Sequence, residues 1–304
     1  TVSGGLNGID MGVSTSGEKQ WWIKSCSFSA FNGAAITGSM WVGDIRDCHI
    51  GRCGYGIKTN GAEGWTDVRI IGTQIYFCTN GGIEFDSTKR TGLVTIIGSR
   101  VERSGGTYGN PAVPLNTNAF GIRLGNVNNI ELIGVSTDAC SGPGLWIGTD
   151  VTDSSKIVYS VIVTGSEFLR DGGGDQTAGA AFPRVRLRGA AHVQFVGNTI
   201  GYGAHNDSNP GQVSPKFGLE LEKATQCQIG YSRVETAVFA DSLNIIGTQN
   251  YGTAINLQPH GLFSFPVANE AAQPAKPLTG SSYYSTTDQK PRWWTGSKWV
   301  DGLN

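Results

Sequence analysis

Short segments in which apolar and polar residues alternate recur along most of the chain. In the stretch from Gly81 to Asp86, Ile83 and Phe85 would lie on one face of a strand and Glu84 and Asp86 on the other, because successive side chains of a strand point to opposite faces. Copies of this unit are Gly8–Met11, Gly56–Thr59, Gly121–Leu124, Gly144–Ile147, Arg184–Leu187 and Gly218–Leu221, with looser copies at Ala35–Thr37 and Ala254–Leu257.

The spacing of the copies predicts how the strands are connected. Ile36 and Ile57 are 21 residues apart, whereas Ile83 and Ile122 are 39 apart. The spacing between copies has a constant minimum and exceeds it by irregular amounts. This indicates coils of one circumference that carry loops of variable length. A second apolar segment, often followed by glycine, occurs at Ile70–Gly72, Ile96–Gly98, Leu132–Gly134, Val163–Gly165, Phe195–Gly197, Gln228–Gly230 and Ile245–Gly247. The pattern predicts an all-β fold, a parallel β-helix with two to three strands per coil that stack about 4.8 Å apart.

The repeat also predicts the domain organisation. We expect the β-helix to span residues 1–258, a Pro/Ala-rich linker residues 259–280, and a small Trp-rich β module residues 281–304. Four segments exceed the length of a coil, and we expect them to leave the stack along one edge and to wall a groove parallel to the helix axis. These segments are Ser104–Ala119, Thr149–Lys156, Asp171–Pro183 and Gly203–Lys216.

Composition excludes several functions. The 45 glycines and the 15% of charged residues are unlike a helical protein, and a net charge of -1 without a basic run argues against binding of nucleic acid. No apolar stretch approaches the roughly 20 residues that span a bilayer, so membrane insertion is not expected. The six cysteines fit buried, reduced core positions, and no Cys/His cluster has the spacing of a zinc site. We therefore expect neither a metal nor a cofactor.

Two features of the sequence resemble known proteins. The irregular coils resemble the right-handed β-helix of the pectate-lyase-like superfamily, and the segment from Tyr283 to Val300 is similar to a short module that closes many bacteriophage tail proteins. Together they resemble a phage tailspike. The resemblance implies a homotrimer that is assembled in the host cytoplasm and located in the virion tail. It also implies binding, and often endo-cleavage, of bacterial surface polysaccharide. Tailspikes usually carry an N-terminal particle-binding domain, which is missing here, so we expect that the chain was cut from a longer protein.

Stacking the repeats in register predicts one outward column of side chains on the face of the groove. Its members are Asp10, Thr37, Lys58, Glu84, Arg123, Trp146, Arg186, Glu220 and Asn256. Glycoside hydrolysis needs two carboxyl groups roughly 5–9.5 Å apart, and residues two apart on a strand, such as Glu84 and Asp86, meet that separation. Glu84 would be the base or nucleophile and Asp86 the acid, with Glu102 on the neighbouring strand as another source of the second carboxylate. The structural alternative is an ion-pair ladder of Lys58, Glu84 and Arg123 without catalytic meaning.

Aromatic and basic residues supply candidates for substrate binding. Trp146 would face outward between Arg123 and Arg186, where an aromatic ring can stack on a sugar and arginines can hold acidic groups. Trp65 and Tyr108 are weaker candidates for the same role. For Trp146 the structural alternative is a ring covered by the loop of residues 149–156 or by another subunit.

Three functions from different classes remain compatible with the sequence. The first is a tailspike that endo-hydrolyses capsule or lipopolysaccharide with a carboxylate pair. The second is a polysaccharide lyase, which would use a Lys, Arg or Tyr as base and release unsaturated products. The third is a receptor-binding tail protein without catalysis. The polygalacturonase motifs Asn-Thr-Asp, Asp-Asp and Gly-His-Gly do not occur, which argues against hydrolysis of pectin.

Overall fold

The computed structural model describes two separate units of the chain, Thr1–Gln258 and Pro259–Asn304. The described residues are 1–12, 20–105, 116, 119–148, 156, 158–172, 182–201, 218–222, 224, 227–230, 233–234, 243–246, 256–257, 267–268, 282–285, 290–294 and 297–301.

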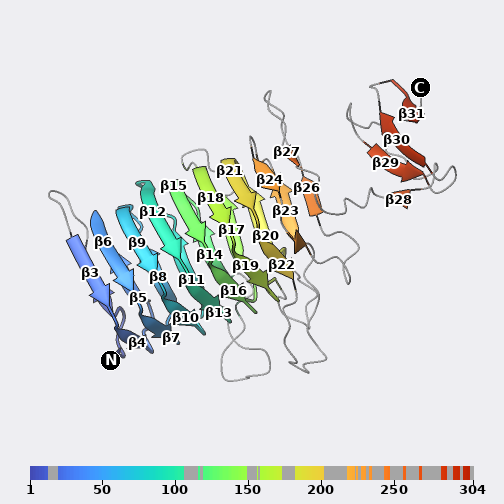
Figure 1. Cartoon of the computed structure of the whole chain (residues 1–304). Helices are drawn as coiled ribbons and strands as arrows, with labels where there is room; N and C mark the ends of the chain where they lie inside the picture. Colours follow the sequence, from blue (N-terminus) through green and yellow to red (C-terminus); the bar gives the residue numbers. More distant parts are fainter. Residues whose placement is uncertain are drawn as a thin grey trace, which may run out of the picture. The chain divides into compact units, whose positions relative to one another are not determined.

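The first unit is a right-handed parallel β-helix, as predicted, and each coil contributes one strand to each of three parallel sheets (Figure 1). In the described part of the chain each of these three sheets has nine strands. Sheet A contains β1 (Val2–Ser3), β4 (Ser27–Ser29), β7 (His49–Gly51), β10 (Gln74–Tyr76), β13 (Arg100–Glu102), β16 (Ser136–Asp138), β19 (Glu167–Leu169), β22 (Thr199–Gly201) and β25 (Arg233–Val234).

Sheet B and sheet C complete the coils. Sheet B contains β2 (Ile9–Asp10), β5 (Ala34–Gly38), β8 (Tyr55–Thr59), β11 (Gly81–Phe85), β14 (Phe120–Leu124), β17 (Leu145–Gly148), β20 (Val185–Arg188), β23 (Leu219–Glu222) and β26 (Leu243–Ile246). Sheet C contains β3 (Gln20–Lys24), β6 (Val42–Arg46), β9 (Thr66–Ile71), β12 (Thr91–Ile97), β15 (Val127–Ile133), β18 (Val158–Thr164), β21 (Ala190–Val196), β24 (Gln228–Gly230) and β27 (Asn256–Leu257).

Aliphatic ladders fill the interior of the coils. Ile57 pairs with Ile83 and Ile83 with Ile122, so the apolar residues of the repeat stack directly on one another. All three are completely buried, as is Phe85. The predicted register of the repeat is therefore correct for these coils, and the polar residues between them face outward.

The corners of each coil depend on single residues with left-handed backbone. The glycine that follows many strands of sheet C, for example Gly98 with φ 55° and Gly134 with φ 59°, turns the chain into sheet A. Asp47 occupies the equivalent corner with φ 52°, which shows that an Asp is accommodated there. The Gly that recurs after the apolar segments in the sequence is thus the turn residue of this corner.

The glycine inside the sheet B repeat has a different cause. A Cβ atom added to Gly82 would lie 2.2 Å from Cγ1 of Val101 and 2.7 Å from the carbonyl oxygen of Gly121. The inward space at this position is already filled by the neighbouring strand of sheet A. Only a residue without a side chain fits there.

Two predictions about the coils were wrong. Leu243–Ile246 pairs with β23 in sheet B, whereas Asn256–Leu257 pairs with β24 in sheet C, so these two segments have the reverse of their expected roles. The segment 149–156 joins β17 of sheet B to β18 of sheet C, whereas the other three long segments join sheet A to sheet B. The four segments therefore do not leave the coils along one edge.

The cysteines of the β-helix have free thiols. Cys48, Cys53, Cys78, Cys140 and Cys227 are buried and Cys26 is half-buried. Burial raises the pKa of the Cys53, Cys78 and Cys140 thiols, which keeps them neutral and unreactive at physiological pH.

The second unit contains a small sheet. Strand β29 (Ser282–Ser285) pairs antiparallel with β30 (Lys290–Trp294), which pairs antiparallel with β31 (Trp299–Asp301). A short strand, β28 (Val267–Ala268), pairs parallel with β29, although it lies in the segment that was expected to be a linker. The described residues include no helix with the length and hydropathy of a membrane span.

Candidate functional site

The outward column of sheet B is assembled as the sequence predicted, except at its last position. Its members, in register from strand to strand, are Asp10, Thr37, Lys58, Glu84, Arg123, Trp146, Arg186 and Glu220, and the residue paired with Glu220 on β26 is Asn244. Asn244 takes the place that was expected for Asn256, because β26 and not β27 belongs to sheet B.

Glu84 lies between two cationic side chains from the adjacent coils. The distance from its Oε2 to Nζ of Lys58 is 2.8 Å, and its Oε1 lies 3.5 Å from Nη1 of Arg123. Glu84 is only 6% exposed. Partial burial alone would lower the pKa of Lys58, but the hydrogen bond to Glu84 and its negative charge outweigh that effect, so the pKa of Lys58 is raised. Lys58 therefore remains cationic and paired.

Asp86 lies just after β11 and also contacts two cations. Its Oδ2 is 2.9 Å from Nη2 of Arg123, and its Oδ1 accepts a hydrogen bond of 2.9 Å from Nζ of Lys156. Gly125 makes room for this carboxylate, since a Cβ there would lie 2.4 Å from Oδ1. One guanidinium, that of Arg123, thus bridges the two carboxylates that were expected to form a catalytic pair.

Trp146 is stacked between the arginines of the neighbouring coils. The guanidinium carbon of Arg123 lies 4.7 Å from the centroid of the indole, and that of Arg186 lies 5.4 Å from it. Since the two arginines come from strands on opposite sides of β17, they cover both faces of the ring. A sugar ring cannot stack on a face of Trp146 without displacing a guanidinium.

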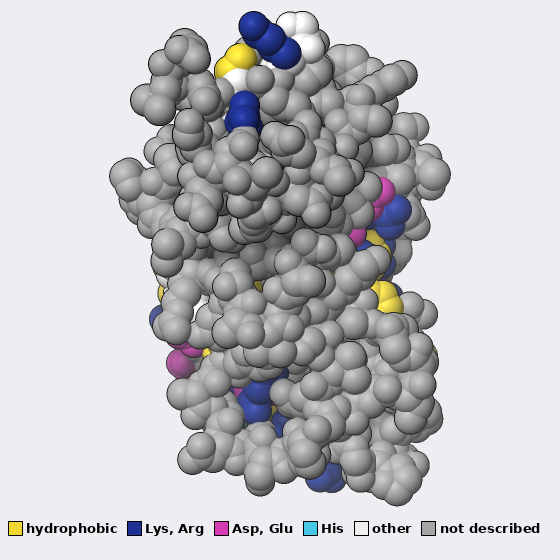
Figure 2. Space-filling view, turned by 90° about the vertical axis from the view of Figure 1, so that its right-hand side faces the viewer, with side chains coloured by type: hydrophobic (Ala, Val, Ile, Leu, Met, Phe, Trp, Pro, Cys, Tyr) yellow, Lys and Arg dark blue, Asp and Glu magenta, His cyan; other side chains and the backbone are white. Residues whose placement is uncertain are grey.

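The ladder continues with further ion pairs. Nε of Arg186 donates a hydrogen bond of 2.8 Å to Oε2 of Glu220, and Nε of Arg188 lies 2.8 Å from Oε2 of Glu222. On the face seen in Figure 2, basic and acidic side chains of the described residues likewise occur together. The arrangement corresponds to the ion-pair ladder of Lys58, Glu84 and Arg123 that the sequence left open as an alternative to a catalytic site, and it extends over several coils.

Glu102 belongs to a different cluster on sheet A. Its carboxylate pairs with Arg100, and it lies in register with Asp138 of the next coil. Asp138 is almost completely buried, and Nε of Arg170 donates a hydrogen bond of 2.7 Å to its Oδ1. The sequence analysis missed this cluster of Arg100, Glu102, Asp138 and Arg170. In the sequence its members stand out only as charged residues at the ends of short apolar segments. The ion-pair partner of Glu102 is on its own sheet and not on sheet B.

Trp65 was wrongly expected to bind substrate. Its side chain is 0% exposed, and its Nε1 donates a hydrogen bond of 2.8 Å to the carbonyl oxygen of Gly38. Its ring packs against Phe85 with 5.5 Å between the centroids, so it is part of the core. Tyr108, the other aromatic candidate, lies outside the described residues.

Asp171 is a polar core residue that sequence reasoning also missed. Its carboxylate accepts hydrogen bonds from the hydroxyl of Thr137 and, at 2.9 Å, from the backbone N–H of Cys140. Burial raises its pKa to about 7, against the opposing effect of these two hydrogen bonds. Asp171 is completely buried, so it cannot reach a ligand at the surface.

No group of three or more His, Cys, Asp or Glu side chains in the described ranges is arranged to hold a metal ion. The charged clusters of sheets A and B consist of carboxylates neutralised by Arg and Lys. These clusters could therefore bind a ligand through hydrogen bonds.

Comparison with solved structures found matches of low similarity, among them two viral proteins. Neither a family model nor a curated protein matches the sequence. Tailspike protein 3 of bacteriophage CBA120 matches with 13% identity and a TM-score of 0.31, over 99% of this chain and 56% of that one. The ORF18 protein of Geobacillus virus E2 matches with 10% identity and a TM-score of 0.33, over 99% of this chain and 79% of that one. This chain therefore spans little more than half the length of the tailspike. Its assignment as a parallel β-helix rests on its own three sheets.

Proposed function

We propose that this chain is the β-helical body of a phage tailspike that binds a bacterial surface polysaccharide along the outer face of sheet B. The similarity of the segment from Tyr283 to Val300 to a phage tail module supports the tail assignment. In this proposal the protein acts in the virion tail as a homotrimer.

The observation that carries the binding site is a pair of hydrogen-bond donors without acceptors. Among the described residues, Nε1 of Trp146 and Nε of Arg123 have no hydrogen-bond partner, although both atoms are buried within the ladder. Buried donors are usually satisfied, so these two call for an acceptor beyond the described residues, and in this proposal the ligand supplies it. A polysaccharide supplies such acceptors in its hydroxyl and ring oxygens.

The ion pairs of sheet B make this surface rigid. Each cation of the ladder is held by a carboxylate, while Lys58 and Arg123 keep 34% and 24% of their side chains exposed. Side chains that are already ordered lose little entropy when they bind, so a modest number of hydrogen bonds suffices. A ladder that repeats about every 4.8 Å also offers polar contacts at a regular spacing to successive sugars of a chain.

The test is Trp146→Phe, which keeps a ring between the two arginines but removes the N–H group. Binding of immobilised capsular and lipopolysaccharide preparations would be measured by biolayer interferometry. We expect the variant to bind the recognised polysaccharide roughly fivefold to tenfold more weakly, the effect of one lost hydrogen bond. The exposed Gln74→Ala on sheet A is the control. Unchanged binding by Trp146→Phe would exclude this surface.

A second candidate is endo-hydrolysis, favoured by two carboxylates, Glu84 and Asp86, on one outward face. Bridging by Arg123 requires that the substrate displace this guanidinium before either carboxylate acts on a glycosidic bond. Release of reducing ends by the protein, lost in Glu84→Gln, Asp86→Asn or Glu102→Gln with binding retained, would establish hydrolysis. Products that absorb in the ultraviolet would indicate a lyase instead, and polysaccharide of unchanged length would leave binding alone.

A further inference from the structure

Two cysteines occupy the same corner of the first two coils. Cys26 and Cys48 directly precede strands β4 and β7 of sheet A. The N–H of His49 donates a hydrogen bond of 2.8 Å to the carbonyl oxygen of Cys26, and His49 pairs with Ser27 in the strands that follow. Cys26 and Cys48 are therefore in register on adjacent coils, where residues lie about 4.8 Å apart. A disulfide joins residues whose Cα atoms are roughly 4.4–6.8 Å apart, so this separation fits one.

The two thiols have the same orientation relative to their own coils. Sγ of Cys26 lies 3.3 Å from the carbonyl oxygen of Lys24. Sγ of Cys48 lies 3.4 Å from that of Arg46, which is again the residue two positions earlier. The hydroxyl of Ser99, at the same corner of a later coil, makes the equivalent contact at 3.2 Å. A thiol is a weak hydrogen-bond donor, so turning the two sulfur atoms toward each other sacrifices little.

The thiols of this pair differ in their access to solvent. Cys26 is half-buried, whereas Cys48 is 0% exposed. Burial raises the pKa of the Cys48 thiol, and a thiolate at Cys26 would raise this pKa further. A reagent in solution therefore reacts first at Cys26, and the loss of the Cys26 thiolate in that reaction makes Cys48 easier to ionise.

A second pair of cysteines has the same register but no access. The N–H of Thr79 donates a hydrogen bond of 2.9 Å to the carbonyl oxygen of Cys53, which places Cys53 in register with Cys78. Cys53 is 1% exposed and Cys78 is 0% exposed. A reagent cannot reach either thiol while the coils are folded. The second pair is thus a matched comparison for Cys26 and Cys48 within the same chain.

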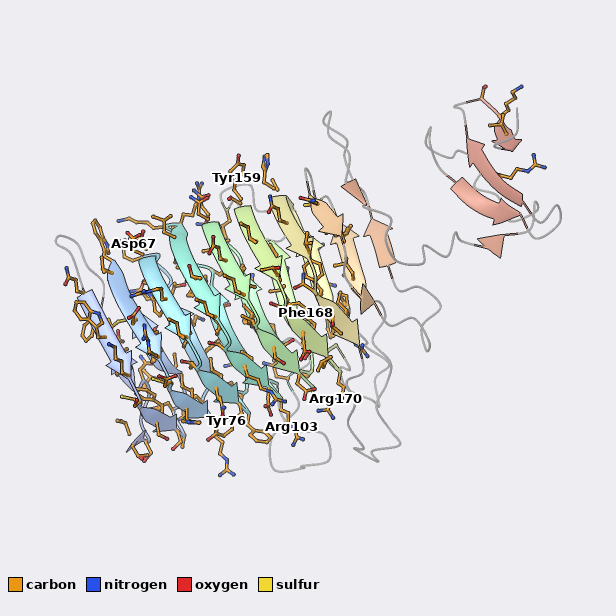
Figure 3. The ribbon with its side chains drawn as sticks, viewed as in Figure 1. Asp67, Tyr76, Arg103, Tyr159, Phe168 and Arg170 are labelled. Carbon is orange, nitrogen blue, oxygen red and sulfur yellow. The ribbon has the colours of Figure 1, made fainter. Side chains whose placement is uncertain are left out.

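The Cys26–Cys48 pair lies at one end of the stack of coils. In the described part of the chain, β1, β2 and β3 are the end strands of sheets A, B and C (Figure 1). Figure 3 shows the side chains of the blue strands at this end. Apolar side chains of the first coil are exposed there, Leu6 by 72% and Trp22 by 57%. Strands paired on one side open more readily than central ones, so a covalent bond to the second coil would restrain this end.

We propose that Cys26 and Cys48 form a modification site, where a low-molecular-weight disulfide oxidises the two thiols to a bond that fastens the first coil to the second. The Cys26 thiolate attacks the reagent RSSR, which gives a mixed disulfide at Cys26 and releases RS⁻. The Cys48 thiolate then attacks Sγ of Cys26 and releases the second RS⁻. The protein loses two electrons and two protons, and the reagent is reduced to two RSH.

The compartment decides when this reaction occurs. Thiols are kept reduced in a bacterial cytoplasm, whereas disulfides form and persist outside the cell. The bridge would therefore be absent while the chain folds and would form after release. The inference goes beyond the proposed function, because neither the reaction nor its effect on the coils involves a polysaccharide.

The test treats the whole chain, purified with a reductant, with millimolar oxidised glutathione and maps the thiols by alkylation and mass spectrometry. We expect Cys26 and Cys48 to be joined with the loss of two hydrogen atoms, while Cys53 and Cys78 stay free. Cys48→Ser should stop at a mixed disulfide between Cys26 and glutathione. Cys26→Ser should leave Cys48 unmodified, and Cys53→Ser should react as the parent does.

Hydrogen exchange measured by mass spectrometry tests the effect on the coils. Amides of residues 20–51 should exchange roughly tenfold to a hundredfold more slowly in the oxidised parent, and a reductant should reverse the change. Oxidation of Cys48→Ser should have no such effect. Serine suits these positions, because Ser99 occupies the corner of Cys48 on a later coil and Ser104 the position equivalent to Cys78.

Several results would overturn the proposal. Glutathione that accumulates on Cys26 of the parent, with Cys48 still free, would show that the pair does not close. Equal oxidation of Cys53 and Cys78 would show that access does not select the site, and links through Cys26 between two copies would assign it to a contact between chains. A bridged protein with unchanged hydrogen exchange would exclude the fastening of the first coil. None of these results bears on binding at sheet B, which is tested separately with Trp146→Phe.

Discussion

Asp171 is a carboxyl group enclosed in the coils beside the backbone of Cys140 and the hydroxyl of Thr137. Gly144 leaves the space for it, since a Cβ at that glycine would lie 2.0 Å from the carboxylate. Desolvation is the largest influence on this group, and the charge of nearby Asp138 adds to it. The native state therefore holds a proton on Asp171 at pH values where the unfolded chain does not.

We predict that Asp171 makes the free energy of unfolding decrease as pH rises from about 4 to about 7. The pKa in the folded protein is about 7 against an unperturbed 3.8, so within this window the folded state binds one proton more than the unfolded state. Stability must then fall with rising pH, by on the order of 4 kcal/mol over the whole window. Asp171→Asn should abolish this slope and stabilise the protein at pH 7 to 8, because the amide can serve both hydrogen bonds without a charge. Denaturant unfolding at several pH values measures the slope.

The matched control is Asp67→Asn at an exposed position with left-handed backbone, which should leave the pH dependence unchanged. Asp171→Ala separates charge from hydrogen bonding. It should lower stability by about 1–3 kcal/mol at pH 5, because it leaves the N–H of Cys140 without its acceptor. A parental slope retained by Asp171→Asn would show that another group titrates.

At the scale of single residues, the sequence predicted on which face of a strand a side chain lies better than it predicted which residues that side chain contacts. The alternation placed Glu84 and Arg123 in one outward column, since the period of a strand is two residues. It did not show that Arg123 would also reach Asp86, because that contact depends on side-chain geometry. Trp65 was misjudged because the local sequence does not show that its ring is buried. Its hydrogen-bond acceptor, Gly38, is 27 residues away and comes near only through stacking of the coils.

The corner between sheets C and A is an element that the sequence marks with glycine. Gly134 has φ 59°, and nothing lies within 4 Å of a Cβ built at this position. Any cost of replacing it must therefore come from the backbone and not from a clash. Asp47, at the same corner of an earlier coil, indicates that a short polar side chain is tolerated.

We predict that Gly134→Val destabilises the protein by about 1–2 kcal/mol, whereas Gly134→Asn is nearly neutral. A β-branched residue is strained in the left-handed region, and Asn is the residue other than glycine that adopts it most readily. Urea unfolding of the two variants measures the difference. Gly61→Val is the control, since a Cβ there also meets nothing within 4 Å but the backbone is not left-handed. Equal stability of the Val and Asn variants would contradict a backbone origin.

The strands of sheets B and C were predicted from the sequence more readily than those of sheet A. Longer strands of sheets B and C, such as β11 with Ile83 and Phe85 and β12 with Val94 and Ile96, carry two inward apolar residues, which gives a visible alternation. Most sheet A strands have three residues with a single inward side chain, such as Ile75 in β10 and Val101 in β13. The local sequence also does not show to which sheet each strand of the last coils belongs. Leu243–Ile246 and Asn256–Leu257 both contain apolar residues, and only their pairing distinguishes their sheets.

At the scale of the whole molecule, the outer face of sheet C carries an apolar line parallel to the helix axis. Ile71, Ile97 and Ile133 are paired in register and continue to Thr164 and Val196. Ile133 is 37% exposed, although it is a β-branched apolar residue on an outward face. Such a line is unusual for a surface in contact with water alone and is typical of a subunit contact. A rotation axis parallel to the β-helix brings the same line of each copy against its neighbour, as cyclic symmetry requires.

We therefore predict that the homotrimer proposed above packs through sheet C, and that Ile97→Glu together with Ile133→Glu dissociates it. Two carboxylates in each copy would be buried against apolar side chains, a change that costs several kcal/mol per contact unless the copies separate. Light scattering coupled to size-exclusion chromatography would measure the mass of the parent and the variant. Gln74→Glu adds one negative charge to the exposed outer face of sheet A and should leave the mass unchanged. A trimer that survives the double substitution would move the contact to another face. A parent that is monomeric at micromolar concentration would exclude self-association of this chain, and the apolar line would then need another partner.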